Sequence, residues 1–140
     1  MSVRLEDVFA ARLADGVLGG ADSDFVVAEW VDPGGPADEP PRLIAPLHLH
    51  LEDDEAWYVL EGTLRFRVGD HELEAHPGSA VFGPHGVPHT FWNPGPGPAR
   101  YLLVMTPRTL RLIETLHELP DRSPETLQEH FRAHGCEIVD

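Results

Sequence analysis

The chain has 140 residues, the length of one ordinary globular domain and too short for two independent hydrophobic cores. Its 10 basic side chains are all Arg, against 24 Asp and Glu, so the formal net charge is −14 and lysine Schiff-base chemistry is excluded. An acidic surface repels phosphate backbones and anionic lipids, so we expect no nucleic-acid partner and no membrane partner. A small molecule and a second copy of the chain are the partners that this charge favours.

The N-terminal residues 1–12 mix charged and apolar side chains and lack the apolar run of a signal peptide. No stretch of the sequence approaches the roughly 20 apolar residues of a membrane-spanning helix. We therefore expect a cytoplasmic protein.

Gly and Pro residues separate short apolar runs through the middle of the chain, which predicts many short strands. The expected strands are, in chain order, 25–31, 43–51, 56–60, 64–68, 72–75, 80–82, 87–91 and 101–105. Since these strands follow one another without an intervening helix, the pattern predicts an antiparallel sandwich or barrel.

Two of the expected strands differ in how clearly the sequence shows which side chains are buried. In 64–68 the apolar residues alternate with Arg65 and Arg67, which indicates one buried and one exposed face. In 101–105 every residue is apolar or aromatic. The pattern therefore leaves open whether the inner face carries Tyr101, Leu103 and Met105, or Leu102 and Val104.

The C-terminal part of the chain has helical patterns. Apolar residues recur at helical spacing from Leu110 to Leu119, which predicts a first helix. A second helix is expected to begin after Ser123 as N-cap, with Pro124 in its first turn, and to end just before Gly135. The single cysteine, Cys136, has no disulfide partner in the chain and is expected to be an inert thiol.

Nine His residues are many for this length, and three of them stand out. His48 and His50 lie two apart in an expected strand, so both side chains lie on the same face. Glu55 follows them, and His89 stands on a later strand. Imidazole and carboxylate groups suit a divalent first-row metal, so we expect one ion of Fe, Mn, Ni, Cu or Zn. For the carboxylate, Glu52 and Asp54 compete with Glu55.

These residues lie in two motifs that resemble those of the cupin superfamily. The first family motif is commonly written G(x)5HxH(x)3–4E(x)6G, and the second G(x)5PxG(x)2H(x)3N. The first reads here as His48-x-His50, Glu55 and Gly62, and the second as Gly78, Pro84-x-Gly86, His89 and Asn93. The leading Gly of the first motif is replaced by Arg42. We expect the turn before that strand to be formed differently, with the ligands unaffected.

The resemblance implies an all-β fold, the double-stranded β-helix or jelly-roll barrel, with two short C-terminal helices. We expect one domain over 1–140, with the barrel core at about 23–106 and the helices at about 107–135. The family spacing implies His48, His50, Glu55 and His89 as the metal ligands and prefers Glu55 over the other two carboxylates.

The resemblance further implies a metal-dependent oxygenase or dioxygenase of the quercetin-dioxygenase-like type, acting on a small apolar or aromatic molecule. Glu55 is the expected catalytic base. Strand parity places Trp57, Phe66 and Phe91 around the substrate pocket. The alternatives are a non-enzymatic sensor or carrier of a small ligand and a redox-neutral isomerase or epimerase. A homodimer is expected, with the helices and the loop 32–41 as candidate contacts.

Overall fold

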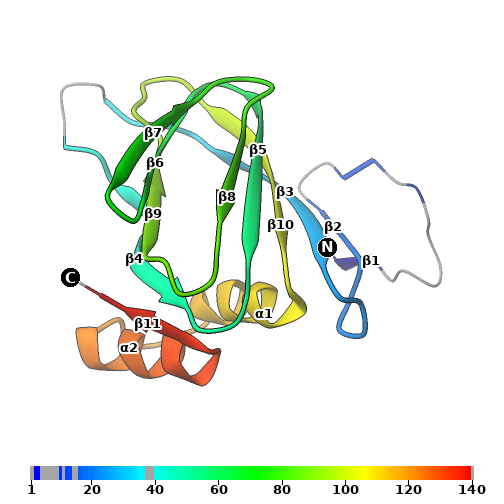
Figure 1. Ribbon diagram of the computed structural model, residues 1–140, viewed down its shortest axis with the longest axis vertical. Coiled ribbons are helices and arrows are strands. Elements are labelled where there is room, and N and C mark those ends of the chain that lie inside the picture. Colours follow the sequence, from blue (N-terminus) through cyan, green and yellow to red (C-terminus); the bar gives the residue numbers. More distant parts are fainter. Residues whose placement is uncertain (1, 4–9, 11, 14–15, 37–39, 140) are drawn as a thin grey trace.

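The computed structural model of the protein describes residues 2–3, 10, 12–13, 16–36 and 40–139. Within these residues the chain forms eleven strands and two helices (Figure 1). The strands are β1 (Ser2–Val3), β2 (Val17–Leu18), β3 (Val26–Asp32), β4 (Leu43–His50), β5 (Glu55–Glu61), β6 (Leu64–Val68), β7 (His71–Ala75), β8 (Ala80–Gly83), β9 (His89–Trp92), β10 (Ala99–Met105) and β11 (Cys136–Ile138). The helices are α1 (Pro107–Leu116) and α2 (Pro124–Ala133). Neither of these two helices is long and apolar enough to cross a bilayer.

The strands form two facing sheets (Figure 1). The first has the order β1-β2-β3-β10-β5-β8 and the second the order β11-β4-β9-β6-β7. Neighbours are antiparallel, apart from the parallel pair β1 and β2. From β3 to β10 the chain crosses to the other sheet at every connection except the hairpin of β6 and β7. The predicted all-β double-stranded β-helix with two short helices is confirmed.

Side-chain alternation decides which face of each strand is buried. In β6, Leu64 and Phe66 are fully buried, while Arg65 reaches across to Glu74 and Glu72 of β7 at 2.6 and 3.1 Å. In β10, Tyr101, Leu103 and Met105 are buried. The open choice for this strand is therefore settled in favour of the set that contains Tyr101.

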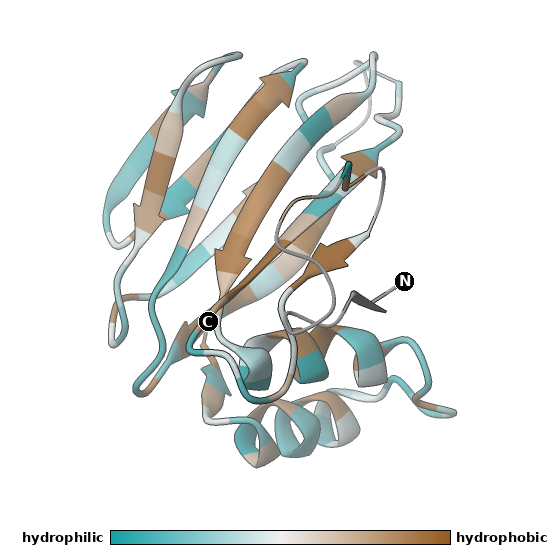
Figure 2. Cartoon of the chain, turned by 90° about the vertical axis from the view of Figure 1, so that its right-hand side faces the viewer, coloured by the Kyte–Doolittle hydropathy of each residue, from teal (hydrophilic) through white to brown (hydrophobic). Residues whose placement is uncertain are grey.

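Two helices lie together at one end of the sheets, as both views show (Figures 1 and 2). The second helix begins as expected: the Ser123 side chain accepts a hydrogen bond from Thr126 N at 3.3 Å. Gly135, with φ of +75°, follows its C-cap. The first helix ends at Leu116, so the expectation that it continues to Leu119 is wrong.

Strands β1, β2 and β11 were not expected from the sequence. Each has at most three residues, too few to show an alternating pattern, and each exists because another strand offers it a free edge. The sequence-based expectation about residues 1–12 falls mostly outside the described residues.

Candidate metal centre

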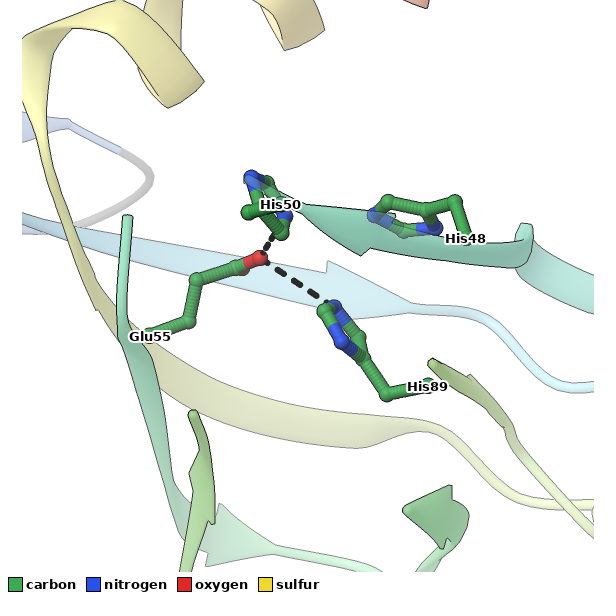
Figure 3. A group of neighbouring side chains, drawn as sticks. All are labelled: His48, His50, Glu55 and His89. Carbon is green, nitrogen blue, oxygen red and sulfur yellow. Dashed lines mark hydrogen bonds and ion pairs between the residues drawn. The ribbon is translucent and has the colours of Figure 1, made fainter. Parts of the chain in front are cut away.

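Three strands bring four ligand-type side chains to one point inside the barrel (Figure 3). His48 and His50 come from alternate positions of β4, Glu55 is the first residue of β5, and His89 is the first residue of β9. One ligand atom from each residue lies within 4.8 Å of the other three. All four residues are at most 5% exposed. The structure thus brings together the four residues that the motifs select as ligands.

Hydrogen bonds to the backbone orient two of the imidazole rings. His48 Nδ1 lies 2.6 Å from Pro46 O, and His89 Nδ1 lies 3.4 Å from Val87 O. A carbonyl oxygen only accepts, so Nδ1 of each ring carries the proton and donates it. Nε2 of each ring then has a free lone pair and is the atom that can bind a metal ion.

The cluster holds more lone pairs than protons. His89 Nε2 lies 3.2 Å from Glu55 Oε1, and His50 Nε2 is in contact with the same oxygen. Among the described residues His50 Nε2 finds no hydrogen bond of ordinary geometry, although it is buried. Lone pairs of two imidazoles and a carboxylate that face one point need a cation between them. The site therefore fits a divalent metal ion.

Burial and neighbouring charges set the protonation of this cluster. Burial, followed by repulsion from His89, lowers the pKa of His48 to about 4. Burial by itself raises the pKa of Glu55, but the imidazoles of His50 and His89 beside its carboxylate outweigh burial and lower the pKa to about 2. At neutral pH His48 is therefore neutral and Glu55 is ionised, as metal ligands must be.

The competing carboxylates point elsewhere. Glu52 is exposed and lies 3.7 Å from Arg108 Nη2, while Asp54 Oδ1 accepts a hydrogen bond from the backbone of His85 at 2.8 Å. Strand β4 ends at His50, so the alternation that would place Glu52 beside it stops there. The turn then brings Glu55 back to the cluster.

A family model described as "Cupin domain" matches residues 37–105. The chain contains a cupin domain. Six more histidines of this cupin, expected on the surface, lie outside the four-residue cluster.

Solved structures share the fold of the cupin. A sugar phosphate isomerase of the cupin superfamily from Silicibacter pomeroyi is 30% identical, with a TM-score of 0.51, over 60% of this chain and 51% of its own. The protein TT1209 from Thermus thermophilus is 25% identical, with a TM-score of 0.51, over 76% of this chain and 98% of its own. A cupin protein from Bacteroides fragilis, 16% identical over 71% of this chain and 80% of its own, has a TM-score of 0.54. The chain spans about half the length of the isomerase. No curated protein matches the sequence significantly.

The four-residue cluster of the cupin opens into a cavity of about 390 Å³. Trp57 and Phe91 lie on its wall, as do Tyr101 and Leu103 of β10. Helix α1 covers the cavity with apolar side chains that include Leu110 and Ile113, and Figure 1 shows this helix across the end of the barrel. The helix thus forms part of the cavity wall next to the four-residue cluster.

Phe66 has a different position from the one expected. Its ring stacks on Phe91 with centroids 5.3 Å apart and packs against Trp57 at 5.2 Å. It is fully buried and does not line the cavity. Phe66 supports the pocket wall from behind because β6 lies one strand further from β4 than β9 does.

Two side chains that the sequence did not place at the site touch His50. Cys136 Sγ lies 3.2 Å from His50 Nδ1, and Thr109 Oγ1 lies 3.5 Å from the same nitrogen. Burial, followed by the negative charges of Glu55 and Asp53, raises the pKa of Cys136 to about 12. This thiol is not a nucleophile at neutral pH, which agrees with the expected lack of reactivity. Its contact with a ligand, 86 residues away in the chain, has no local signal in the sequence.

Proposed function

We propose that this cupin is a divalent-metal-dependent oxygenase that acts on a small apolar or aromatic molecule held in the 390 Å³ cavity. The observation that supports this most directly is the position of the four ligand groups, which lie on the wall of a cavity whose other walls are mainly apolar and aromatic. Ligand cavities of enzymes commonly combine such walls with a few polar groups at one end.

His48, His50, Glu55 and His89 are the proposed ligands of a single ion of Fe, Mn, Ni, Cu or Zn. When bound, such an ion supplies a Lewis acid with coordination positions that the protein leaves open. The apolar walls exclude water and hold the substrate against Trp57 and Phe91. Glu55 is the proposed catalytic base, because its ionised carboxylate reaches the cavity. A carboxylate oxygen of Glu55 can there accept a proton from a substrate hydroxyl.

A redox-neutral isomerase is the second candidate, because a 30% identical structure is described as a sugar phosphate isomerase. A phosphate group is normally held by Arg, Lys or several backbone N–H groups. The sequence has no Lys, and in the described part of the chain no Arg lines the cavity. The cavity chemistry therefore favours an uncharged apolar substrate over a sugar phosphate.

A sensor or carrier that binds the same molecule without converting it is the third possibility. It uses the same metal centre and the same cavity, so the reaction itself must be assayed. Oxygen uptake that requires both the metal and an organic substrate distinguishes the oxygenase from the other two.

The test begins with metal reconstitution of the purified protein by Fe, Mn, Ni, Cu or Zn, followed by metal analysis. We expect one ion per chain in the wild type, and loss of that ion in His89→Ala. His85→Ala is the matched control, since His85 lies in the same motif but is bonded to Asp54 outside the cluster. Failure of the wild type to bind any of these metals would refute the proposal.

Substrate assays follow with the loaded protein. Oxygen-electrode measurements with flavonols, catechols and diketones are expected to show oxygen uptake in the metal-loaded wild type and none in His89→Ala. Conversion of a sugar phosphate without oxygen uptake would instead establish the isomerase. Saturable binding of an apolar compound without turnover would establish the carrier.

Three further expectations stay predictions. They are one domain over 1–140, a cytoplasmic location and a homodimer. The expected dimer contact in the loop 32–41 includes residues 37–39, which lie outside the described residues. Sedimentation velocity of the full chain tests the dimer directly.

A further inference from the structure

The three ligand histidines are held in two different ways. His48 and His89 donate Nδ1–H to a carbonyl two residues earlier in the chain. His50 makes no such bond in the described part of the chain. Its Nδ1 faces Cys136 Sγ at 3.2 Å and Thr109 Oγ1 at 3.5 Å. Both residues are about 1% exposed, and both belong to the C-terminal extension, residues 107–139, beyond the matched cupin domain.

Strand β11 holds Cys136 in place beside His50. It pairs antiparallel with β4, with Cys136 opposite His50. Backbone hydrogen bonds continue on both sides of this pair, from Leu51 N to Gly135 O at 2.8 Å and from Val139 N to Leu47 O at 2.9 Å. The thiol therefore has a defined position beside β4, the strand that carries two of the four ligand residues.

Contacts of Gly135 and Arg108 join this strand to α1 at the same corner. A Cβ on Gly135, which has φ of +75°, would lie 3.0 Å from the Arg108 guanidinium carbon. Arg108 in turn donates to Asp53 at 2.9 Å, in the turn that leads to Glu55. The positive φ favours glycine at this position, and the Arg108 side chain packs closely against it.

Hydrogen bonds around the thiol and the hydroxyl define where the protons lie. Cys136 Sγ is placed to donate to His134 O, 3.6 Å away, which leaves a sulfur lone pair for His50. Thr106 Oγ1 donates to Thr109 Oγ1 at 3.2 Å, so that oxygen also has a lone pair free. Both neighbours can thus accept from His50 Nδ1–H. In that tautomer the proton-free nitrogen of His50 is Nε2, which lies at the cluster without a hydrogen-bond partner of its own.

We propose that Cys136, assisted by Thr109, is a positioning residue of the metal centre, which fixes the Nε2-ligating tautomer and ring orientation of His50 through an N–H···S hydrogen bond. The C-terminal extension is then part of the metal site as well as a cover for the barrel. This inference rests on the proposed metal site. An acceptor on the far nitrogen of a ligand histidine raises its basicity as a ligand, and loss of such a partner typically lowers metal affinity by about 10- to 100-fold.

The first experiment uses the unmodified chain. Long-range ¹H–¹⁵N correlation spectra of the zinc-loaded, ¹⁵N-labelled protein report which ring nitrogen of each histidine carries a proton. The proposal requires His50 to carry it on Nδ1 with Nε2 bound to zinc. A proton on Nε2 of His50, in protein that holds one zinc ion, would overturn the proposal.

The second experiment measures Co²⁺ and Zn²⁺ affinity, together with the visible absorption bands of the Co²⁺ form. We expect Cys136→Ala to bind about 10- to 100-fold more weakly and to shift the Co²⁺ bands. Cys136→Ser, which restores an acceptor, is expected to recover most of the affinity with bands that differ from those of the wild type. Thr109→Val, which keeps the side-chain shape without the hydroxyl, is expected to have a smaller effect of the same sign.

Glu137→Gln is the matched control, because Glu137 lies next to Cys136 in β11, pairs with Arg132 of α2 at 2.7 Å, and makes no hydrogen bond or ion pair with His50 in the described part of the chain. It is expected to leave affinity and spectrum unchanged. If Cys136→Ala and Cys136→Ser both match the wild type in affinity and in Co²⁺ spectrum, the proposal is wrong while the metal site stands. If the wild type binds neither metal, the metal site itself is wrong, and this proposal falls with it. If Cys136→Ala fails to fold, the tautomer measurement can still overturn the proposal, and Cys136→Ser and Thr109→Val still test the role of the two acceptors.

Discussion

Replacing His48 by Asn removes a buried imidazole that makes the metal-free protein sensitive to acid. Burial, followed by repulsion from His89, lowers the pKa of His48 from 6.5 to about 4 in the folded chain. Between these two values the unfolded chain binds a proton at this position and the folded chain does not. The free energy of unfolding therefore falls as the pH falls from 6.5 to about 4. Well above pH 6.5 the imidazole is neutral in both the folded and the unfolded chain, so this loss of stability is absent.

The size of this effect follows from the same two pKa values. At about 1.4 kcal/mol for each pKa unit, protonation of His48 in the unfolded chain lowers the free energy of unfolding by about 3 kcal/mol between pH 6.5 and about pH 4. That is a large part of the roughly 5–15 kcal/mol by which a domain of this kind is stable. Glu55 acts in a different window, because its pKa is lowered from 4.5 to about 2 and its contribution is lost only below pH 4.5.

Urea unfolding with EDTA present, followed by tryptophan fluorescence, measures the free energy of unfolding at pH 7 and at pH 4.5. The wild type is expected to lose roughly 2–3 kcal/mol more than His48→Asn across this range. His71→Asn, at an exposed position of β7, is the control and is expected to follow the wild type. Equal losses in wild type and His48→Asn, within about 1 kcal/mol, would refute the reasoning.

Three other substitutions test the fold and the cavity. Gly62→Ala places a Cβ against Pro98 O at a φ of +77° and is expected to cost at least about 1–3 kcal/mol in chemical denaturation, whereas Gly97→Ala, in open space, is expected to cost less than 1 kcal/mol. Phe66→Ala is expected to lower the free energy of unfolding by about 3–5 kcal/mol with one metal ion still bound, since this ring supports the pocket without reaching the ligands. Ile113→Trp fills the cavity under α1, so oxygen uptake with the best flavonol, catechol or diketone is expected to fall at least about 10-fold with metal content unchanged. Unchanged uptake in that variant would place the substrate elsewhere.

Local patterns were sufficient for the strands β3 to β10 and for most of the candidate ligand residues. The strand 64–68 is predicted residue for residue, because its alternation of apolar side chains and Arg is a direct record of its two environments. The second helix is likewise readable from Ser123, Pro124 and Gly135, which act on the backbone within one turn. His48 and His50 are recognisable because the two-residue repeat of a strand by itself places them side by side.

Positions that depend on partners far away in the chain were less predictable. The apolar residues of β10 fit either face, and only the facing sheet, where the Phe91 ring lies 5.6 Å from that of Tyr101, decides that Tyr101 is on the buried face. The position of Phe66 behind the cavity wall depends on the order of strands within the sheet, which periodicity along one strand does not contain.

The nine histidines show where sequence and tertiary structure each contribute. The resemblance to the cupin motifs was enough to separate three candidate ligand histidines from the other six and to prefer Glu55. The amino-acid composition by itself predicted an acidic exterior without lysine. Only the folded chain decides that Cys136 and Thr109 lie against His50, that α1 covers the cavity, and that Phe66 stands behind it. Such contacts join residues up to 86 positions apart, and their geometry is set by sheet pairing and core packing, which no local stretch of sequence encodes.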